Sequence, residues 1–342
     1  YGQEAAESAL AEGFASGRMH HGWLLIGPEG VGKATLAYRL AAHALALPHE
    51  RDPFGQSLAV DAETTAGRQV RALSHPGLLL LRRPWDFKAK RLSGAITVDE
   101  VRRLRMFLSH QAATDAWRIV LVDSADDLNV NAANALLKSL EEPPARTLFL
   151  LVSSAPGRLL ATIRSRCRTL ELQPLPIEPL RKAMTQALTQ SEKEHPAPGQ
   201  WPLIERLAKG SVRRALSLST GGGIALYERI ERIVGHLPRV EWSAVHTLGD
   251  ELSGIANEQR FELFFELLQD LLARVIHAAA TGTGAPEDIK LAERLVPPGR
   301  LVAWSELWEA LGTDKAIAMS LNLDRKALIL DTFAKLEAAA RR

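Results

Sequence analysis

The stretch GPEGVGKATL, residues 27–36, decides which fold this sequence predicts. The phosphate-binding pattern G-x-x-x-x-G-K-[ST] is matched there at Gly27, Gly32 and Lys33. Its last position, whose hydroxyl holds Mg²⁺ in nucleotide-binding proteins, is occupied by Ala34. A threonine follows one position late, so the stretch predicts a phosphate-binding loop with a defective metal site.

The residues around this stretch favour a nucleotide-binding loop over an ordinary turn. An apolar run at 22–27 predicts a buried strand, and 33–46 is predicted to form a long helix. In that setting, backbone N–H groups and the N-terminus of the helix can bind phosphate. The alternative is a glycine-rich turn without a ligand. The predicted nucleotide-binding residues of the loop are Gly27, Gly30, Gly32, Lys33, Ala34 and Thr35.

Beyond the loop, apolar segments alternate with helical ones. Strands are predicted at 77–83, 117–128, 147–156 and 169–175, and helices at 97–110 and 129–144. This alternation predicts an α/β fold with a parallel sheet and helices on both faces. After residue 179 the chain reads as helical. The predicted domains are an α/β domain at 1–173, a helical lid at 174–235 and a helical C-terminal domain at 236–342.

The composition is that of an ordinary globular chain and excludes several classes of protein. The 342 residues carry 42 basic and 40 acidic side chains, so any nucleic-acid contact must come from a local patch. The one cysteine, Cys167, cannot form an internal disulfide or a cysteine-rich zinc site. No apolar run approaches the roughly 18 residues of a membrane span. The start lacks both a methionine and a signal-peptide pattern, so we expect a trimmed, cytoplasmic protein with no membrane partner.

A second motif, IVLVDSAD at 119–126, ends a predicted strand in acidic residues. In a phosphate-loop ATPase an acid at this place holds Mg²⁺, and a neighbouring residue activates or orients the attacking water. Asp123 fills the first position, but Ser124 fills the second and cannot act as a base. Asp126 lies three residues beyond Asp123 and is expected to point elsewhere. The alternative is that Asp123 only caps the turn that follows.

Three arginines lie in and just after TIRSRC, residues 162–167: Arg164, Arg166 and Arg168. A basic run is usually a solvated face of a domain. After the fourth strand of such a sheet, however, an arginine can project into the nucleotide site of a neighbouring subunit. A planar guanidinium suits the charge on a γ-phosphoryl group during its transfer.

Three segments are informative in combination: NAANALLKSLEEPP (131–144), TIRSRC (162–167) and GSVRRALSL (210–218). Together they resemble the clamp-loader branch of the AAA+ ATPases, and within it the delta-prime family of bacterial DNA polymerase III. The similarity covers the first 220 residues, and NLDRKALIL (322–330) is similar to the family's collar domain. The resemblance implies a AAA+ RecA-like parallel sheet with a helical lid and an all-α C-terminal collar domain.

The resemblance also implies roles for individual residues. Arg166 falls on the family's arginine finger, which acts in trans on the ATP of a neighbouring subunit. Arg213 falls on the sensor-2 arginine of the lid, and the polar sensor-1 position falls on Ser153 or Ser154. These positions and Asp123 complete the predicted nucleotide site. The alternative for Arg213 is an arginine that only makes a helix N-terminus soluble.

The sequence departs from the family's pattern in two respects. Many relatives carry a four-cysteine zinc module, but the matching stretch at 47–75 has no cysteine, so no zinc is expected. The ATP-hydrolysing subunits carry a complete GK[ST] and an Asp–Glu pair, whereas this chain has Ala34 and Ser124. Both changes affect hydrolysis and neither affects Arg166. We therefore expect negligible ATPase activity, with ATP or ADP binding in the loop left open.

The resemblance implies a non-motor clamp-loader subunit that supplies Arg166 to an adjacent ATP site. Its implied partners are the motor and delta subunits, the sliding clamp and primer-template DNA, in a hetero-oligomer that loads the clamp during replication. Nothing in the sequence resembles a polymerase active site, so a label of DNA-directed DNA polymerase, or nucleotidyltransferase, would describe the assembly. The alternative is an autonomous AAA+ ATPase, the motor subunit itself, which would carry Ser or Thr at 34 and Glu at 124.

Two surface predictions follow from charge and apolar patterning. The arginine-rich VRRLR at 101–105 could contact phosphates, but a solvated helix face is the favoured interpretation, and no helix-turn-helix or zinc finger indicates a DNA-binding module. The C-terminal domain is expected to be the main oligomer contact. The alternative is that its apolar stripe fills its own core; this stripe includes Phe261, Phe264, Leu268 and Leu272.

Overall fold

The computed structural model describes residues 1–52, 54–87, 91–109, 116–321 and 323–341. The chain divides into two compact units: the first contains residues 1–187 and 209–213, and the second contains residues 188–208 and 214–342. The predicted phosphate-binding loop belongs to the first unit, and the second unit is helical.

The first unit is built on a five-stranded sheet in which every hydrogen-bonded pair of neighbours is parallel. In the spatial order β2, β5, β6, β1 and β7, its strands are Leu78–Leu81, Arg118–Asp123, Thr147–Ser153, Gly22–Ile26 and Arg168–Glu171. Strand β6 is buried along its whole length, as expected for a parallel strand covered on both faces. Because the strands are parallel, the segments that follow β1, β5 and β6 emerge at the same edge of the sheet.

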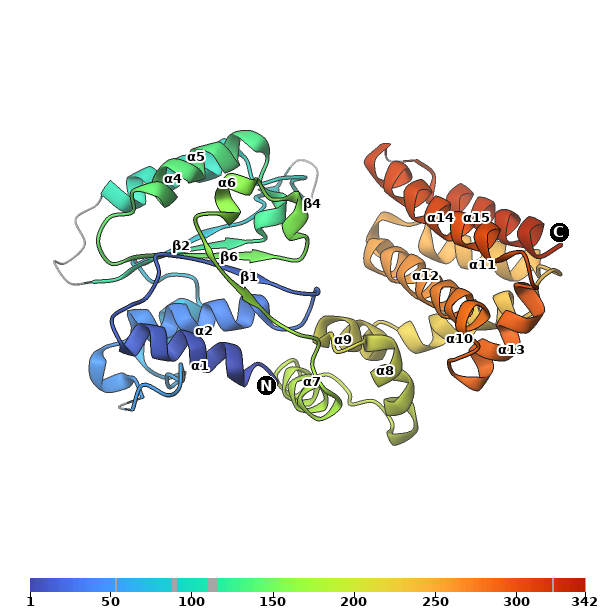
Figure 1. The fold of residues 1–342 in the computed structure, drawn as a ribbon, viewed down its shortest axis with the longest axis horizontal. Helices are drawn as coiled ribbons and strands as arrows, with labels where there is room; N and C mark the ends of the chain where they lie inside the picture. Colours follow the sequence, from blue (N-terminus) through green and yellow to red (C-terminus); the bar gives the residue numbers. More distant parts are fainter. Residues whose placement is uncertain (53, 88–90, 110–115, 322, 342) are drawn as a thin grey trace. The chain divides into compact units, whose positions relative to one another are not determined.

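Helices cover both faces of this sheet (Figure 1). One face carries α1 (Glu4–Ala15) and α2 (Lys33–Leu45), and the other carries α4 (Val98–Ser109), α5 (Val130–Glu141) and α6 (Ala161–Arg164). Alternate strand residues point to opposite faces, so Leu25 packs in the core with α1 and α2 while Leu24 packs in the core with α4 and α5. The predicted fold class, a parallel α/β sheet with helices on both faces followed by helices, is confirmed.

Shorter elements complete the first unit. They are α3 (Thr65–Arg71), the antiparallel pair β3 (Trp85–Asp86) and β4 (Arg91–Leu92), and the 3-10 turns η1 (Pro48–Glu50), η2 (Ala125–Asp127) and η3 (Pro156–Arg158). Most of α7 (Ile177–Gln190) also belongs to this unit. The turn η2 directly follows β5, so it lies at the edge of the sheet where the phosphate-binding loop emerges.

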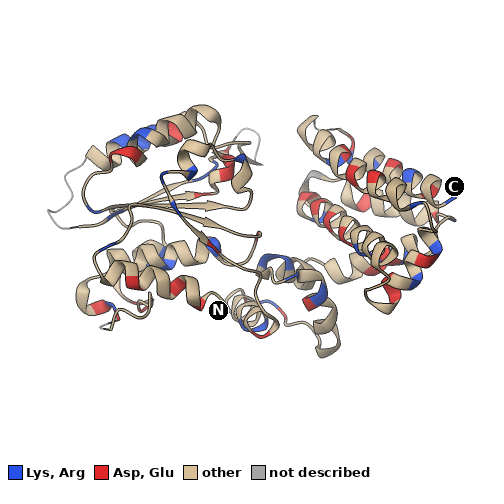
Figure 2. Ribbon diagram, viewed as in Figure 1, with Lys and Arg blue, Asp and Glu red and all other residues tan. Residues whose placement is uncertain are grey.

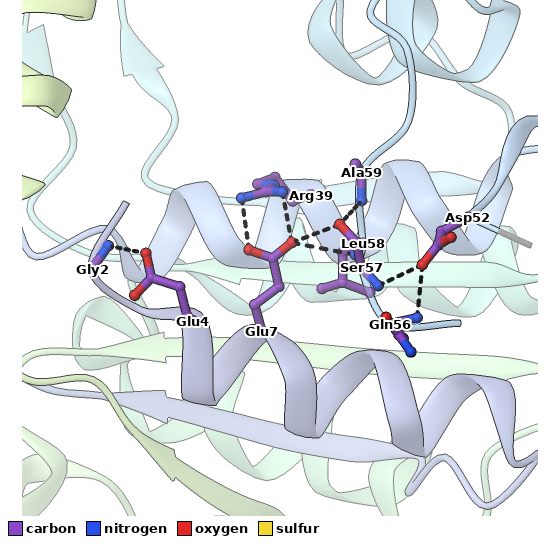
Figure 3. A network of polar contacts seen from close by, with 9 residues as sticks. All are labelled: Gly2, Glu4, Glu7, Arg39, Asp52, Gln56, Ser57, Leu58 and Ala59. Carbon is purple, nitrogen blue, oxygen red and sulfur yellow. Dashed lines mark hydrogen bonds and ion pairs between the residues drawn. The ribbon is translucent and has the colours of Figure 1, made fainter. Parts of the chain in front are cut away.

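The segment between α2 and β2, for which no zinc is expected, is held by carboxylates (Figure 3). Glu7 of α1 accepts two hydrogen bonds from the Arg39 guanidinium of α2, at 2.8 and 2.6 Å, and one from the backbone N–H of Leu58, at 3.3 Å. Asp52 accepts bonds from backbone N–H groups within the segment. Leu58 is 1% exposed, so these bonds fix the segment to the core. Among the described residues, no cluster of His, Cys, Asp and Glu is arranged to hold a metal ion.

None of the described residues of the second unit lies in a strand. Its helices and turns are η4 (Pro198–Gln200), α8 (Trp201–Ala208), α9 (Val212–Thr220), α10 (Gly223–Gly235), α11 (Trp242–Leu252), η5 (Ile255–Asn257), α12 (Glu258–Thr281), α13 (Pro286–Leu295), α14 (Leu301–Leu321) and α15 (Arg325–Arg341). The apolar stripe at Phe261, Phe264, Leu268 and Leu272 lies in α12, and each of its side chains is at most 1% exposed. The stripe fills the core of its own unit, which was the alternative interpretation, so it does not support a subunit contact. That the C-terminal domain is the main oligomer contact stays a prediction.

The arginine-rich stretch at 101–105 lies on α4, where basic and acidic residues are mixed (Figure 2). Arg102 pairs with Asp99, and Arg103 pairs with Glu100, both one helical turn away. Two of its three arginines are therefore already paired on the helix surface, which favours the solvated-face interpretation over phosphate binding. None of the described helices is both long enough and apolar enough to cross a membrane.

Candidate functional site

The predicted phosphate-binding loop connects β1 to α2 and takes a conformation that requires glycine. Gly27 and Gly30 have φ angles of 139° and 79°, in the region that residues with a side chain rarely adopt. A Cβ atom at Gly27 would lie 2.2 Å from the carbonyl oxygen of Leu172, and one at Gly30 would lie 2.2 Å from Ser211 Oγ. Gly32 is the N-cap of α2. The first two glycines are thus required by the packing of the chain on itself, whether or not a nucleotide binds.

The lysine of the loop is folded back onto its own chain. Lys33 is 5% exposed, and its Nζ donates hydrogen bonds to the carbonyl oxygens of Gly27 and Pro28, at 2.7 and 2.6 Å, and to Ser154 Oγ, at 2.9 Å. An ammonium group has three N–H donors, so all of them are used within the protein. Burial lowers the pKa of Lys33, and nearby carboxylates, Glu29 first among them, oppose this shift. A phosphate that enters the loop must therefore displace contacts that already satisfy the ammonium.

The positions that follow the lysine do not supply a magnesium ligand. Ala34 packs its methyl group against the core on the α1 and α2 side of the sheet. Thr35 is exposed, and because successive residues of an α-helix are about 100° apart around its axis, its hydroxyl points away from the position of Ala34. The structure gives no support to the idea that Thr35 replaces the missing hydroxyl.

The acidic end of β5 is arranged differently from the sequence prediction. Burial raises the pKa of Asp123, and Arg82 opposes that shift. The Oγ atom of Ser124 caps η2 and donates a hydrogen bond to Asp126 Oδ2 at 3.1 Å. Ser124, and not Asp123, therefore caps the turn, so the alternative role for Asp123 is wrong. Asp123 remains a half-buried carboxylate near Lys33, to which it is electrostatically coupled.

Asp126 joins the ends of β5 and β6, although its place in the sequence predicts that it points elsewhere. It accepts hydrogen bonds from Ser153 Oγ at 2.5 Å, from the backbone N–H of Ser154 at 2.6 Å and from that of Ala155 at 3.2 Å. Ser153 is fully buried and turned toward Asp126, while Ser154 is the serine that contacts Lys33. Of the two predicted sensor-1 positions, Ser154 thus lies beside the loop lysine. The sequence does contain a feature that could have predicted these bonds. An acidic residue follows one parallel strand, and serines lie at the end of the neighbouring strand.

Arg213, which the resemblance assigns to the nucleotide site, lies beside the phosphate-binding loop. Its guanidinium forms an ion pair with Glu29 of the loop, and the backbone N–H of Val212 donates to the carbonyl oxygen of Gly30 at 2.9 Å. Val212 and Arg213 open α9, so the start of that helix closes over the loop. The partner of Arg213 in this structure is therefore the carboxylate of Glu29, whereas the resemblance implies a nucleotide phosphate.

The three arginines around α6 have different surroundings. Arg168 lies over the ring of Trp23, with its Cζ atom 5.1 Å from the ring centre. Arg164 is exposed and forms no ion pair with any described residue. Arg166 follows α6, and its Nη2 atom lies 2.6 Å from Glu141 Oε1 at the end of α5. Its side chain is 35% exposed, so it is held at the surface of the domain.

Arg166 lies at the opposite edge of the sheet from the phosphate-binding loop. A Cβ atom at Gly22, the first residue of β1, would lie 3.3 Å from the carbonyl oxygen of Arg166. The loop begins after Ile26, at the other end of that strand. A strand of this length spans roughly 13 Å from its first Cα atom to its last. The structure therefore brings Lys33 and Arg213 together at one edge and keeps Arg166 apart from them.

A family model and the curated relatives both point to subunits of DNA polymerase III. The family model described as "DNA polymerase III, delta subunit" matches residues 2–176 of the chain. The delta' subunit of DNA polymerase III from Escherichia coli (strain K12) is 30% identical over 334 residues, which are 96% of this chain and 92% of that protein. The tau subunit from Salmonella typhimurium is 28% identical over 322 residues, which are 88% of this chain and 48% of that protein. The chain thus spans about half the length of that tau subunit.

A solved structure of a DNA polymerase III gamma subunit-related protein from Thermotoga maritima is also similar. The alignment covers 97% of this chain and 99% of that one, at 18% sequence identity and a TM-score of 0.45. Because the two chains are this distant, no residue role is carried over from that structure to this chain.

Proposed function

Because the chain belongs to the DNA polymerase III delta-subunit family and is a clamp-loader subunit of the delta-prime type, we propose that it is a non-motor subunit whose Arg166 completes the ATP site of a neighbouring ATPase subunit. Its proposed partners are the motor and delta subunits, the sliding clamp and primer-template DNA. In this proposal the chain helps to load the clamp onto primed DNA during replication and does not itself hydrolyse ATP.

The observation that carries this proposal is the position of Arg166. Its backbone lies at the start of β1, at the opposite edge of the sheet from the chain's own phosphate-binding loop. An arginine placed there cannot serve its own loop, but it is exposed enough to reach another subunit. Its planar fork of N–H donors suits the charge that spreads over a γ-phosphoryl group during transfer.

The chain's own loop does not fit hydrolysis of Mg²⁺-ATP. It retains the glycine geometry of a phosphate-binding loop, but Ala34 offers no oxygen to a metal and Ser124 offers no base. The donors of Lys33 are already bonded within the protein. These features oppose the alternative of an autonomous motor subunit. We expect ATP or ADP to bind weakly, if at all, because each must first displace Lys33.

The test is the DNA- and clamp-stimulated ATPase activity of the complex reconstituted with wild-type or Arg166→Ala chain. We expect the variant to assemble normally and to lower ATP turnover. Arginine fingers contribute roughly 10³ to 10⁵ in rate in the best-studied GTPases, but the loss here is smaller because other ATP sites of the complex keep their own arginines. Arg166→Lys should restore little, since an ammonium lacks the planar fork.

The matched control is Arg164→Ala, which removes an exposed arginine two residues away that forms no ion pair with a described residue. This control should leave turnover unchanged. Equal turnover with wild-type and Arg166→Ala chains would refute the proposed finger.

A further inference from the structure

The guanidinium of Arg166 is held at two points by the protein. Its Nη2 atom pairs with Glu141 Oε1 at 2.6 Å, and its Nη1 atom donates to the carbonyl oxygen of Thr162 at 3.0 Å, with Ser165 Oγ at 3.4 Å. A guanidinium carries five N–H donors, and no described residue accepts a hydrogen bond from the Nε–H. The group is therefore fixed along one side while part of its donor fork stays available.

The position of Glu141 is not explained by the helix to which it belongs. It is the last residue of α5, and cations are favoured at a helix C-terminus because the helix dipole is negative there. Glu142 follows, and the two prolines after it prevent the helix from continuing. Glu142 is exposed and pairs with no described residue, whereas Glu141 pairs with Arg166. The helix dipole thus disfavours a carboxylate at 141, and the pairing with Arg166 offsets that cost.

We propose that Glu141 is the positioning residue for Arg166, an inference that rests on the proposed function of Arg166 as a finger acting in trans. A free arginine side chain samples many rotamers, and it must lose that freedom when it meets the transition state. A side chain already held by Glu141 and Thr162 has lost much of it beforehand, so more of the contact energy lowers the barrier. Glu141 acts through Arg166 and does not itself touch the nucleotide.

The test uses the reconstituted complex and compares Glu141→Ala with Glu142→Ala. Both variants remove one carboxylate from the end of α5, but only the first removes a partner of Arg166. We expect Glu141→Ala to lower kcat for ATP by roughly two- to fivefold, the range that corresponds to an exposed ion pair, and to leave KM unchanged. Glu141→Gln should fall between wild type and Glu141→Ala, because its amide oxygen still accepts a hydrogen bond. Glu142→Ala should match wild type.

A double variant separates positioning from a general structural effect. If Glu141 acts through Arg166, then adding Glu141→Ala to Arg166→Ala causes no further loss of kcat. A further loss in that background would overturn the proposal, as would an unchanged or increased kcat in Glu141→Ala alone. Unchanged turnover with Arg166→Ala would instead refute the proposed function of Arg166 as a finger. A lower kcat with Arg166→Ala but not with Glu141→Ala would refute only the positioning role of Glu141.

Discussion

At the scale of single residues, contacts made within the chain occupy the two cationic side chains that a nucleotide would need. Lys33 gives its three donors to Gly27, Pro28 and Ser154, and Arg213 pairs with Glu29. In an active phosphate-binding loop the lysine reaches a nucleotide phosphate instead. The two cations beside this loop are thus paired without a ligand.

The isolated chain should therefore show no ATPase activity above background. Ala34 and Ser124 remove the metal hydroxyl and the base, and no other described side chain beside the loop replaces both. Phosphate release from Mg²⁺-ATP, followed over time, is the measurement. Steady release that disappears in Lys33→Ala would contradict this expectation and would favour the motor-subunit alternative.

At the scale of elements, α14 exposes apolar side chains that its own unit does not cover. Trp308 and Ile317 are exposed and line a groove of about 690 Å³ between α14 and α12. The lining also includes Gly312 and Thr313 of α14 and Gln269 of α12. Because the stripe in α12 is buried, this groove is the better candidate for the subunit contact in the proposed hetero-oligomer.

Ile317→Asp should weaken assembly with the other clamp-loader subunits. A carboxylate in a contact that loses its water is costly, and we expect Kd to rise by about tenfold, which corresponds to ~1.4 kcal/mol. The thermal unfolding of the isolated chain should not change, since the side chain is exposed. Binding of labelled chain to the other subunits measures the effect.

Ala303→Asp is the control for that experiment, because Ala303 is exposed on the same helix but does not line the groove. Equal Kd values for wild type and Ile317→Asp, or an equal loss with Ala303→Asp, would contradict the assignment of the groove as a subunit contact.

At the scale of the whole molecule, the sequence predicted the elements well and their contacts less well. Local patterns predict the strand, loop and helix around Gly27–Leu36 and the parallel sheet. These patterns are the periodicity of apolar residues and the spacing of glycines. The bonds of Asp126 to Ser153 and of Glu141 to Arg166 join residues more than twenty positions apart, so no local pattern contains them. The same limit explains the stripe in α12, since an apolar helix face looks alike in a core and in an interface.

In the proposed function, this subunit contributes an arginine to the ATP site of a neighbouring subunit and has no working ATP site of its own. The sharpest measurement of this role counts the molecules of ADP–aluminium fluoride that the reconstituted complex traps, because such a transition-state analogue depends on the finger. We expect a complex with Arg166→Ala to trap one analogue fewer than the wild-type complex, and a complex with Arg164→Ala to trap the wild-type number. Equal numbers for wild type and Arg166→Ala would contradict it.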